Sequence, residues 1–562
     1  SPNYTALLAL REAVGKVDLV DIRQDLAARE MLAQDGFDLD QGMVFEHEGK
    51  RYWGAAAVNR MAQLAARHDW FNRVNARIFS SPSLSALIYP LLRAGRNVAL
   101  FLMGRERVAA NPSETMNVFA IFSHALGINA LAELAYYLRY SKALPITWVV
   151  AAVGSYLILR PRSPRAFACL VACMLANGIA QMPSGSNHAM LSNCTLAAIL
   201  LAAAYTWLKG RTWSDFIQTF APIGRALLAT MYVFGVFHKI NSGFLNPTVS
   251  CAMDLWRAMP QPLPLISANW FAYAAIYGTL IIESLILVGL LTHRWRYVAV
   301  MMGIAFHSML SLSAHGTYLA FSTLTIALHL LFLSPGAATR ITRSASWKAL
   351  QASTRTPLGL LAVATWIGGM LVSAHEPARV SLLWLPWSLW LICLVGKHGR
   401  ERTGETTVGP SIYSKVVALN ILSVAFFVSC SMPYMGLKTA QSMNMFANLT
   451  HEDGRSNHLI FTSAPTMFGY LNDVATPKAT DSPALAYYVE REMSMPYYSL
   501  LDILERNPDA SVSFTRKGVL YEHQNAKSLA ADIELELHPR WMRSLFHFRA
   551  FAKAGDEACE PG

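Results

Sequence analysis

The sequence predicts a polytopic α-helical membrane protein with a soluble α/β domain before its helices and a soluble α+β domain after them. Hydrophobic residues make up 53% of the 562 residues and charged residues 15%, whereas charged residues form about a quarter of a soluble domain. The apolar residues gather in runs close to the ~20 residues that a helix needs to cross a bilayer. The basic residues cluster in short loops between these runs, so the net charge of +11 reports membrane topology and does not indicate nucleic-acid binding.

The N-terminal domain is predicted over residues 1–105, with an order of elements that suits a thioredoxin-like layer. YTALLALREAV has helical spacing, and VDLVDI has the pattern of a short strand. MVFEHEGKRYW predicts a hairpin that turns at Glu48–Gly49, and a helix is expected over 55–67. Residues 84–103 are apolar but interrupted by a proline and two arginines, so we expect an interfacial helix there and not a span.

About eleven membrane spans are predicted, in a core over 115–335 and an additional helical part over 357–431. Their approximate bounds are 115–138, 144–159, 166–182, 189–208, 222–240, 269–291, 297–314, 317–334, 357–375, 380–396 and 412–431. This order places five basic loops on one side of the membrane, which the positive-inside rule makes the cytoplasmic side. The N-terminal domain is therefore expected in the cytoplasm and the C-terminal α+β domain, residues 432–562, outside the cell membrane. One basic stretch, 139–142, falls on the outer side and departs from the rule.

The predicted span within residues 221–244 carries an unusual set of polar residues. Arg225, Tyr232 and Lys239 are spaced so that they share one face of a helix over ~21 Å. Ionisable residues inside a membrane are costly and usually face other helices or a cavity. We therefore predict that this face lies inside the helix bundle.

Lys239 is the strongest candidate for chemistry, because a partly dehydrated lysine can act as a general base. His188, in the polar loop MPSGSNH, is the second candidate, as a neutral imidazole that steadies an anion. The predicted topology puts both residues and His238 at the outer leaflet, where they could share one cavity. Plainer interpretations stay open: Lys239 or Arg225 can anchor a helix end at the interface, and His188 can be an ordinary loop histidine.

Three further polar residues fall inside predicted spans. Glu283 should be protonated or paired with a cation such as Arg225 or Lys239. His307 and His329 are expected to make hydrogen bonds between helices. The sequence contains no zinc helix, phosphate loop, nucleophile elbow or dinucleotide fingerprint, and the seven cysteines lack zinc-site spacing, so no metal is predicted.

Three motifs in the membrane core resemble a known family. GVFHKIN at 235–241, SNHAML at 186–191 and AFHSMLSL with YLAFSTLTIALHLLFLSP within 305–335 are similar to a core that vitamin K-dependent gamma-carboxylase shares with bacterial horizontally transferred transmembrane domain (HTTM) proteins. The similarity covers about 115–335 and keeps the order of the motifs. The segment 433–459 also resembles the tail of fusion proteins that contain an HTTM core.

This resemblance implies quinol-driven carbon-acid chemistry in a bacterial cytoplasmic membrane. In the carboxylase, the lysine that matches Lys239 deprotonates vitamin K hydroquinone, and oxygen converts the anion to an alkoxide that removes a glutamate γ-proton. Carbon dioxide then traps the carbanion, and the histidine that matches His188 is associated with stabilising it. The carboxylase has a second lysine where this chain has His238, so the electrostatics of the base differ.

The N-terminal domain resembles a different family. VDLVDIR, GKRYWGAAAVNRMAQL and the basic, aromatic helix at 84–105 are similar to the DCC family of thioredoxin-like proteins, which occur fused to HTTM cores. That family carries an Asp-x-x-Cys-x-x-Cys motif ahead of its first helix, whereas residues 1–103 contain no cysteine. Either the motif lies upstream of Ser1, or the domain has no redox activity.

The sequence therefore favours a membrane enzyme that uses a membrane quinol and oxygen on a substrate approaching from outside, with the use of carbon dioxide left open. Lys239 and His188 are the predicted catalytic residues. The predicted quinol-binding residues are Arg225, Tyr232, His238, Glu283 and His307. Two other functions stay open, a non-catalytic subunit that docks onto a larger membrane assembly and a quinone-linked thiol-disulfide relay. Lys239 facing lipid, or ion-paired in a dry core, would favour the subunit.

Overall fold

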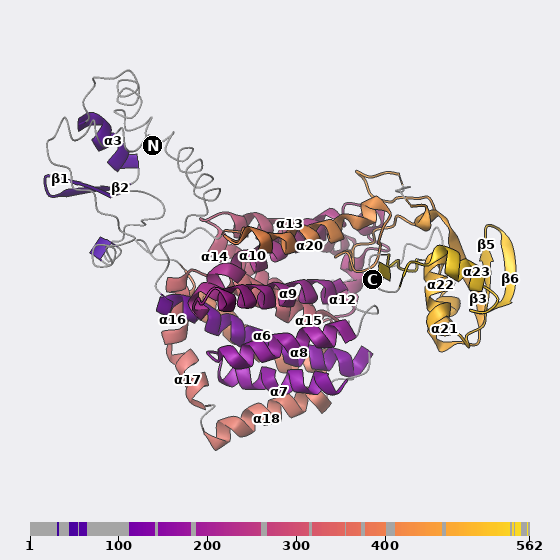
Figure 1. Ribbon diagram of the computed structural model, residues 1–562, viewed down its shortest axis with the longest axis horizontal. Coiled ribbons are helices and arrows are strands. Elements are labelled where there is room, and N and C mark those ends of the chain that lie inside the picture. Colours follow the sequence, from indigo (N-terminus) through magenta and orange to yellow (C-terminus); the bar gives the residue numbers. More distant parts are fainter. Residues whose placement is uncertain are drawn as a thin grey trace. The chain divides into compact units, whose positions relative to one another are not determined.

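A computed structural model describes most of the chain (Figure 1). The described residues are 31–32, 44–53, 55–64, 112–140, 144–180, 187–259, 267–313, 317–353, 356–372, 377–400, 411–463, 468–539, 542–543, 546–551 and 559. The contacts divide the chain into two units. Ser1–Glu114, with Ser334–Ala337 and Arg400–Gly409, forms one unit and the rest of the chain forms the other, and each is described by itself.

The described part of the N-terminal unit is a β-hairpin followed by a helix. β1 (Val44–His47) and β2 (Lys50–Trp53) pair antiparallel. Glu48 and Gly49 join them with φ angles of 52° and 74°, the positive values that a type I′ turn requires. α3 (Ala55–Leu64) follows directly and packs on β2.

These elements confirm the predicted hairpin turn and the predicted helix after it. The strand expected at VDLVDI and the interfacial helix expected over 84–103 lie outside the described residues. The thioredoxin-like layer therefore stays a prediction.

Helices build the membrane part, and every predicted span coincides with one of them (Figure 1). They are α6 (Pro112–Tyr140), α7 (Pro145–Leu159), α8 (Pro164–Ala180), α9 (Asn187–Leu208), α10 (Trp213–Phe237), α13 (Asn269–Leu291), α14 (Arg296–Leu310), α15 (Thr317–Leu330), α18 (Pro357–Val372), α19 (Pro377–His398) and α20 (Ile421–Ser431). Shorter helices connect them: α11 (Ser242–Leu245), α12 (Cys251–Arg257), α16 (Pro335–Arg343), α17 (Ala345–Ser353), η1 (Val417–Asn420) and η2 (Met432–Met435).

The number of full-length spans is smaller than predicted. Among the described residues, five helices are long and apolar enough to cross a bilayer, and α15 with α16, bent by 112°, would make a sixth if the pair is one broken span. α7, α8 and α14 are apolar but have only 15, 17 and 15 residues. At 1.5 Å per residue they reach about 22–26 Å, less than the ~30 Å hydrocarbon core. The prediction of eleven spans treated each apolar run as a crossing, whereas several runs form short helices.

α10 packs against four other helices of the membrane part, α9, α13, α15 and α20. Its first turn is held by a backbone N–H of Thr212 that donates to Asp215 Oδ2 at 2.9 Å. Further along, a Cβ added at Gly224 would lie 2.6 Å from Leu331 Cδ1, so glycine allows α15 to approach closely. Tyr232 is 1% exposed and Lys239, just after α10, is 8% exposed, so this polar face lies inside the bundle, as the sequence predicts.

The C-terminal part combines short helices with a small sheet. Its antiparallel sheet has the order β4-β3-β5-β6. The elements are η3 (Tyr470–Asn472), β3 (Val474–Thr480), α21 (Pro483–Glu490), β4 (Met495–Pro496), α22 (Tyr497–Arg506), β5 (Val512–Arg516), β6 (Val519–Gln524) and α23 (Ala530–Glu536). The predicted turn at Lys517–Gly518 is present, with φ angles of 52° and 80°.

The segment 436–463 between α20 and this sheet packs on the C-terminal end of α10. Ser242 N donates to Asn457 O and Leu459 N to Ile240 O, each at 3.0 Å. The part of the chain that follows α10 and the part that follows α20 therefore lie at the same end of the bundle, as the predicted topology requires.

Candidate functional site

A cavity lies beside the C-terminal half of α10. Its walls come from α10, α11, α12, α13, α14 and α15 and from residues 443–446. Aromatic rings supply much of the lining: Phe244, Trp256, Phe306, Tyr318, Phe321 and Phe446. Methionines supply another part: Met231, Met259, Met309, Met443 and Met445. An apolar wall of rings and adaptable thioethers, with a few polar groups, is typical of a small-molecule site.

Lys239 and Glu283 form an ion pair at the cavity wall. Lys239 Nζ lies 2.8 Å from Glu283 Oε1 and 2.6 Å from Oε2, and each residue is 8% exposed. Glu283 comes from α13 and Lys239 follows α10, so the pair joins two helices. A buried carboxylate needs a cation or a proton, and here Lys239, one of the two predicted cations, is its partner.

Tyr232, His307 and His329 form a second polar group, made by α10, α14 and α15. Tyr232 Oη lies 2.9 Å from His307 Nε2 and 3.1 Å from His329 Nε2. His329 Nδ1 in turn lies 2.7 Å from the carbonyl oxygen of Thr325. Tyr232 and His307 line the cavity, and all three side chains are at most 1% exposed. The predicted interhelical hydrogen bonds of His307 and His329 are therefore present, and both are made to Tyr232.

The cavity brings together four of the predicted site residues: Lys239, Tyr232, Glu283 and His307. Arg225 is not among its lining residues. It lies toward the other end of α10, where Nε donates to Leu331 O at 2.9 Å. Arg225 and Lys239 share a helix but do not share a site.

His238 precedes the cavity lysine but faces the segment after α20. Its Nε2 lies 3.0 Å from Ser442 O, so this nitrogen donates, and Nδ1 accepts from the Tyr434 hydroxyl at 2.8 Å. Both nitrogens therefore bind the chain that follows α20, at Tyr434 of η2 and at Ser442. His238 does not line the cavity.

His188 is buried at the first turn of α9, with 1% exposure. Its ring meets that of Tyr136 edge to face, with centroids 4.8 Å apart. It lies at the same end of the α9–α10 hairpin as Lys239, as predicted, but it is not a lining residue of the Lys239 cavity. Residues 181–186 of its loop lie outside the described residues. The catalytic role of His188 stays a prediction.

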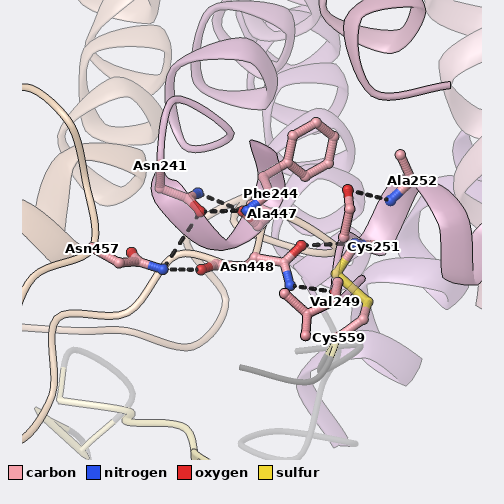
Figure 2. Close-up of a disulfide and its surroundings, with 10 residues drawn as sticks. Asn241, Phe244, Val249, Cys251, Ala252, Ala447, Asn448, Asn457 and Cys559 are labelled. Atoms are coloured by element: carbon pink, nitrogen blue, oxygen red, sulfur yellow. Dashed lines mark hydrogen bonds between the residues drawn. A yellow bond between two sulfur atoms is a disulfide. The ribbon is translucent and has the colours of Figure 1, made fainter. Parts of the chain in front are cut away.

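A disulfide between Cys251 and Cys559 joins the cavity wall to the C-terminal end of the chain (Figure 2). Cys251 starts α12, which lines the cavity, and its backbone N–H donates to Asn448 Oδ1 at 2.8 Å. Figure 2 shows Asn241 and Asn457 on the side of Asn448 that faces away from Cys251. The Asn241 amide donates to Ala447 O at 2.6 Å. The edge of the cavity formed by the start of α12 and residues 436–463, called the rim below, is therefore held by a disulfide and by amide hydrogen bonds.

The same rim contains a histidine that burial keeps neutral. His451 is 2% exposed, and burial lowers its pKa to about 4. Neither of its ring nitrogens has a hydrogen bond in the described part of the chain, and its ring packs edge to face against Tyr434. Protonation of His451 in acid should therefore destabilise this part of the chain.

Sequence reasoning did not identify the aromatic wall or the disulfide. The rings come from five separate segments, so no local pattern marks them as one lining. Cys251 and Cys559 are separated by 308 residues, but a signal existed, because the other five cysteines lie within the apolar runs predicted as spans. These two alone fall outside apolar runs, on the same predicted side of the membrane.

Comparison with protein-family models, curated proteins and solved structures found no match for the chain. The apolar helices and their packing define a helical membrane protein. Function must accordingly be argued from the cavity itself.

Proposed function

We propose that this protein is a quinol-dependent membrane enzyme whose reaction is of the carboxylase or oxygenase type and takes place in the Lys239 cavity. The observation that carries the proposal is an acid–base pair, Lys239 with Glu283, in the wall of a cavity lined mainly by aromatic rings and methionines. A quinol combines a flat apolar ring with ionisable hydroxyls, and it fits this combination of surfaces. The partial resemblance to the gamma-carboxylase core points to the same class of reaction.

The residues divide into two tasks. The aromatic and methionine wall excludes water and accepts the ring, which strengthens electrostatic interactions inside the cavity. The Lys239–Glu283 pair receives a hydroxyl proton, and the Lys239 ammonium then stays beside the negative charge. A bound quinol would supply the reducing equivalents for the reaction, and oxygen would be the oxidant that accepts them.

The test is quinol-dependent oxygen uptake by the purified protein in lipid. We expect Lys239→Met combined with Glu283→Gln to lower turnover on the order of 10²-fold or more, because the site loses its proton acceptor. Lys209→Met is the matched control, because it removes an exposed lysine in the turn after α9. Unchanged turnover in the folded double variant, or no uptake by the unaltered protein with any membrane quinol, would refute the proposal.

We further propose that the cavity rim and residues 432–562 lie outside the cytoplasm of a bacterial cell. The Cys251–Cys559 disulfide supports this orientation, since disulfides persist in oxidising compartments. The predicted basic loops on the opposite side agree with it. Protease added to intact spheroplasts should cleave within 432–562 and spare residues 1–105, whereas the reverse pattern would overturn the orientation.

One observation favours the second function, a non-catalytic subunit of a larger assembly. Lys239 is ion-paired, and an ion pair can serve only to hold α10 against α13. A purely structural pair could be replaced by apolar residues without loss of function in the assembly. The double variant therefore distinguishes the two functions.

A further inference from the structure

One ring nitrogen of His307 has no partner in the part of the chain that the structure describes. The residue lines the cavity, is 1% exposed, and uses Nε2 to contact Tyr232, whereas Nδ1 is buried without a hydrogen bond. Ser311, one turn later, donates to Ser308 O and so does not serve Nδ1. Leaving a buried polar atom without a partner is costly. Because His307 lines the cavity, a molecule bound there can supply the missing partner of Nδ1.

The hydrogen bonds behind His307 determine which nitrogen carries its proton. They start at the carbonyl of Thr325, which can only accept, so His329 Nδ1, 2.7 Å away, must carry a proton. His329 is fully buried and has no ion pair among the described residues, so the charged imidazolium would be strongly disfavoured. His329 is therefore neutral, and its Nε2 is an acceptor.

The protonation of His329 then sets which atom donates in each of the next hydrogen bonds, from Tyr232 to His307 in the cavity wall. The single hydroxyl proton of Tyr232 is donated to His329 Nε2, at 3.1 Å. The tyrosine oxygen can then only accept from His307 Nε2, at 2.9 Å, so that nitrogen carries the proton of His307. His307 Nδ1 is left as a bare acceptor. Gly303 makes the arrangement possible, because a Cβ there would lie 2.0 Å from His329 Nε2.

We propose that the Tyr232–His329 relay makes His307 Nδ1 an obligate hydrogen-bond acceptor that selects a ligand hydroxyl, so that the cavity binds a quinol in preference to its oxidised quinone. A quinol presents O–H donors, whereas a quinone presents only carbonyl acceptors, which meet the lone pair of Nδ1 unfavourably. The identity of the ligand rests on the proposed function. The relay itself rests on the hydrogen bonds alone.

Lys239 cannot supply this selectivity. Its ammonium has three N–H donors, of which Glu283 takes two, and a remaining donor accommodates a quinone carbonyl as well as a hydroxyl oxygen. Discrimination between the two redox states therefore depends on His307. His307 is in this sense the specificity-determining residue of the cavity.

The relay is tested without any ligand by the protonation state of the two His307 nitrogens. In the full-length protein labelled with ¹⁵N-histidine, nitrogen chemical shifts, assigned by comparison with His307→Gln, should show Nε2 protonated and Nδ1 bare. Tyr232→Phe removes the oxygen that accepts from Nε2, so the bare Nδ1 should become protonated in part of the molecules. A protonated Nδ1 in the unaltered protein would overturn the proposal.

The ligand preference is tested by anaerobic binding of menadiol and of its oxidised form, menadione. We expect the unaltered protein to bind menadiol about tenfold more tightly, the size of effect expected for one hydrogen bond. His307→Phe and Tyr232→Phe should reduce the ratio to near one. Thr279→Val is the matched control, because Thr279 also lines the cavity but donates its hydroxyl to Ala275 O, and it should keep the preference.

The two measurements separate the inference from the proposed function. Equal affinity for menadiol and menadione in the unaltered protein would overturn the selective role of His307. If the expected protonation state is observed and neither compound binds, the quinol assignment and the proposed function fail, while the relay itself stands.

Discussion

The two ends of α10 carry buried or partly buried cations in contrasting surroundings. Arg225, toward one end, donates to two backbone carbonyls, Leu331 O at 2.9 Å and Ser411 O at 3.3 Å. Lys239, about 21 Å further along the axis, faces the carboxylate of Glu283 and a cavity. Carbonyls accept hydrogen bonds but take up no proton near neutral pH, so the Arg225 end can only hold chain segments together. The two ends show that the group paired with a membrane cation, and not the position of the cation along the helix, decides whether it can take part in proton transfer or only holds segments together.

The largest effect on stability is expected from breaking the Lys239–Glu283 pair on one side. Lys239→Met leaves a buried carboxylate without a cation, and the loss of one partner of such a pair costs about 3–5 kcal/mol. Thermal unfolding of the purified protein in detergent measures the loss.

The control for this prediction is the double variant Lys239→Met, Glu283→Gln. It removes both charges, so most of the lost stability should return even though turnover stays low. If the double variant were as unstable as the single one, the cost would come from packing at this end of α10 and not from the charge.

A somewhat smaller effect is expected at the disulfide, which exists only at the Lys239 end. Cys251→Ser releases the link across 308 residues, and native disulfides typically contribute about 2–4 kcal/mol. Because Cys251 starts α12, the variant should also weaken ligand binding in the cavity. Unfolding temperature and menadiol binding measure the two effects, with Cys393→Ser, a free cysteine on α19, as the control that should change neither.

Acid should also loosen the Lys239 end before the Arg225 end. In the folded protein the pKa of His451 is about 4, below its ordinary 6.5, so between these values the unfolded chain binds a proton that the folded chain does not. The contribution of this residue is therefore complete above pH 6.5 and declines as the pH falls toward 4. At pH 5 the loss is about 2 kcal/mol, from 1.36 kcal/mol per pH unit.

Hydrogen exchange at pH 7 and pH 5 measures this difference region by region. Exchange should accelerate in residues 436–463 and remain nearly constant around Arg225. His451→Asn should reduce the acceleration. If hydrogen exchange accelerated equally at both ends of α10, His451 would not be the cause of the loss of stability in acid.

The sequence predicted the features that local rules govern. Helix positions followed from apolar runs, and the hairpin turns at Glu48–Gly49 and Lys517–Gly518 from their turn residues. The pairing of Glu283 with a cation followed from the cost of a charge in a membrane.

Features that depend on the packing of distant helices were not predictable in the same way. His307 and His329 were each expected to make hydrogen bonds between helices, but their meeting at Tyr232 requires the register of α10, α14 and α15. The topology correctly placed His188 at the Lys239 end of the α9–α10 hairpin, yet it could not tell that the ring packs against Tyr136. The side of the membrane on which a residue lies can be inferred from loop charges, whereas the cavity that it lines depends on side-chain packing.

The smallest effect is expected at Arg225, and it sharpens the comparison most directly. Arg225→Met leaves the carbonyls of Leu331 and Ser411 without this donor, which costs about 1–3 kcal/mol in unfolding free energy. Arg225→Lys should recover part of that stability, because an ammonium can reach one carbonyl but lacks the planar fork of the guanidinium. Neither variant should alter quinol-dependent oxygen uptake at saturating quinol, since Arg225 does not line the cavity. A loss of turnover in Arg225→Met as large as that in the Lys239 double variant, at a temperature where both are folded, would mean that the two ends of α10 act as one site after all.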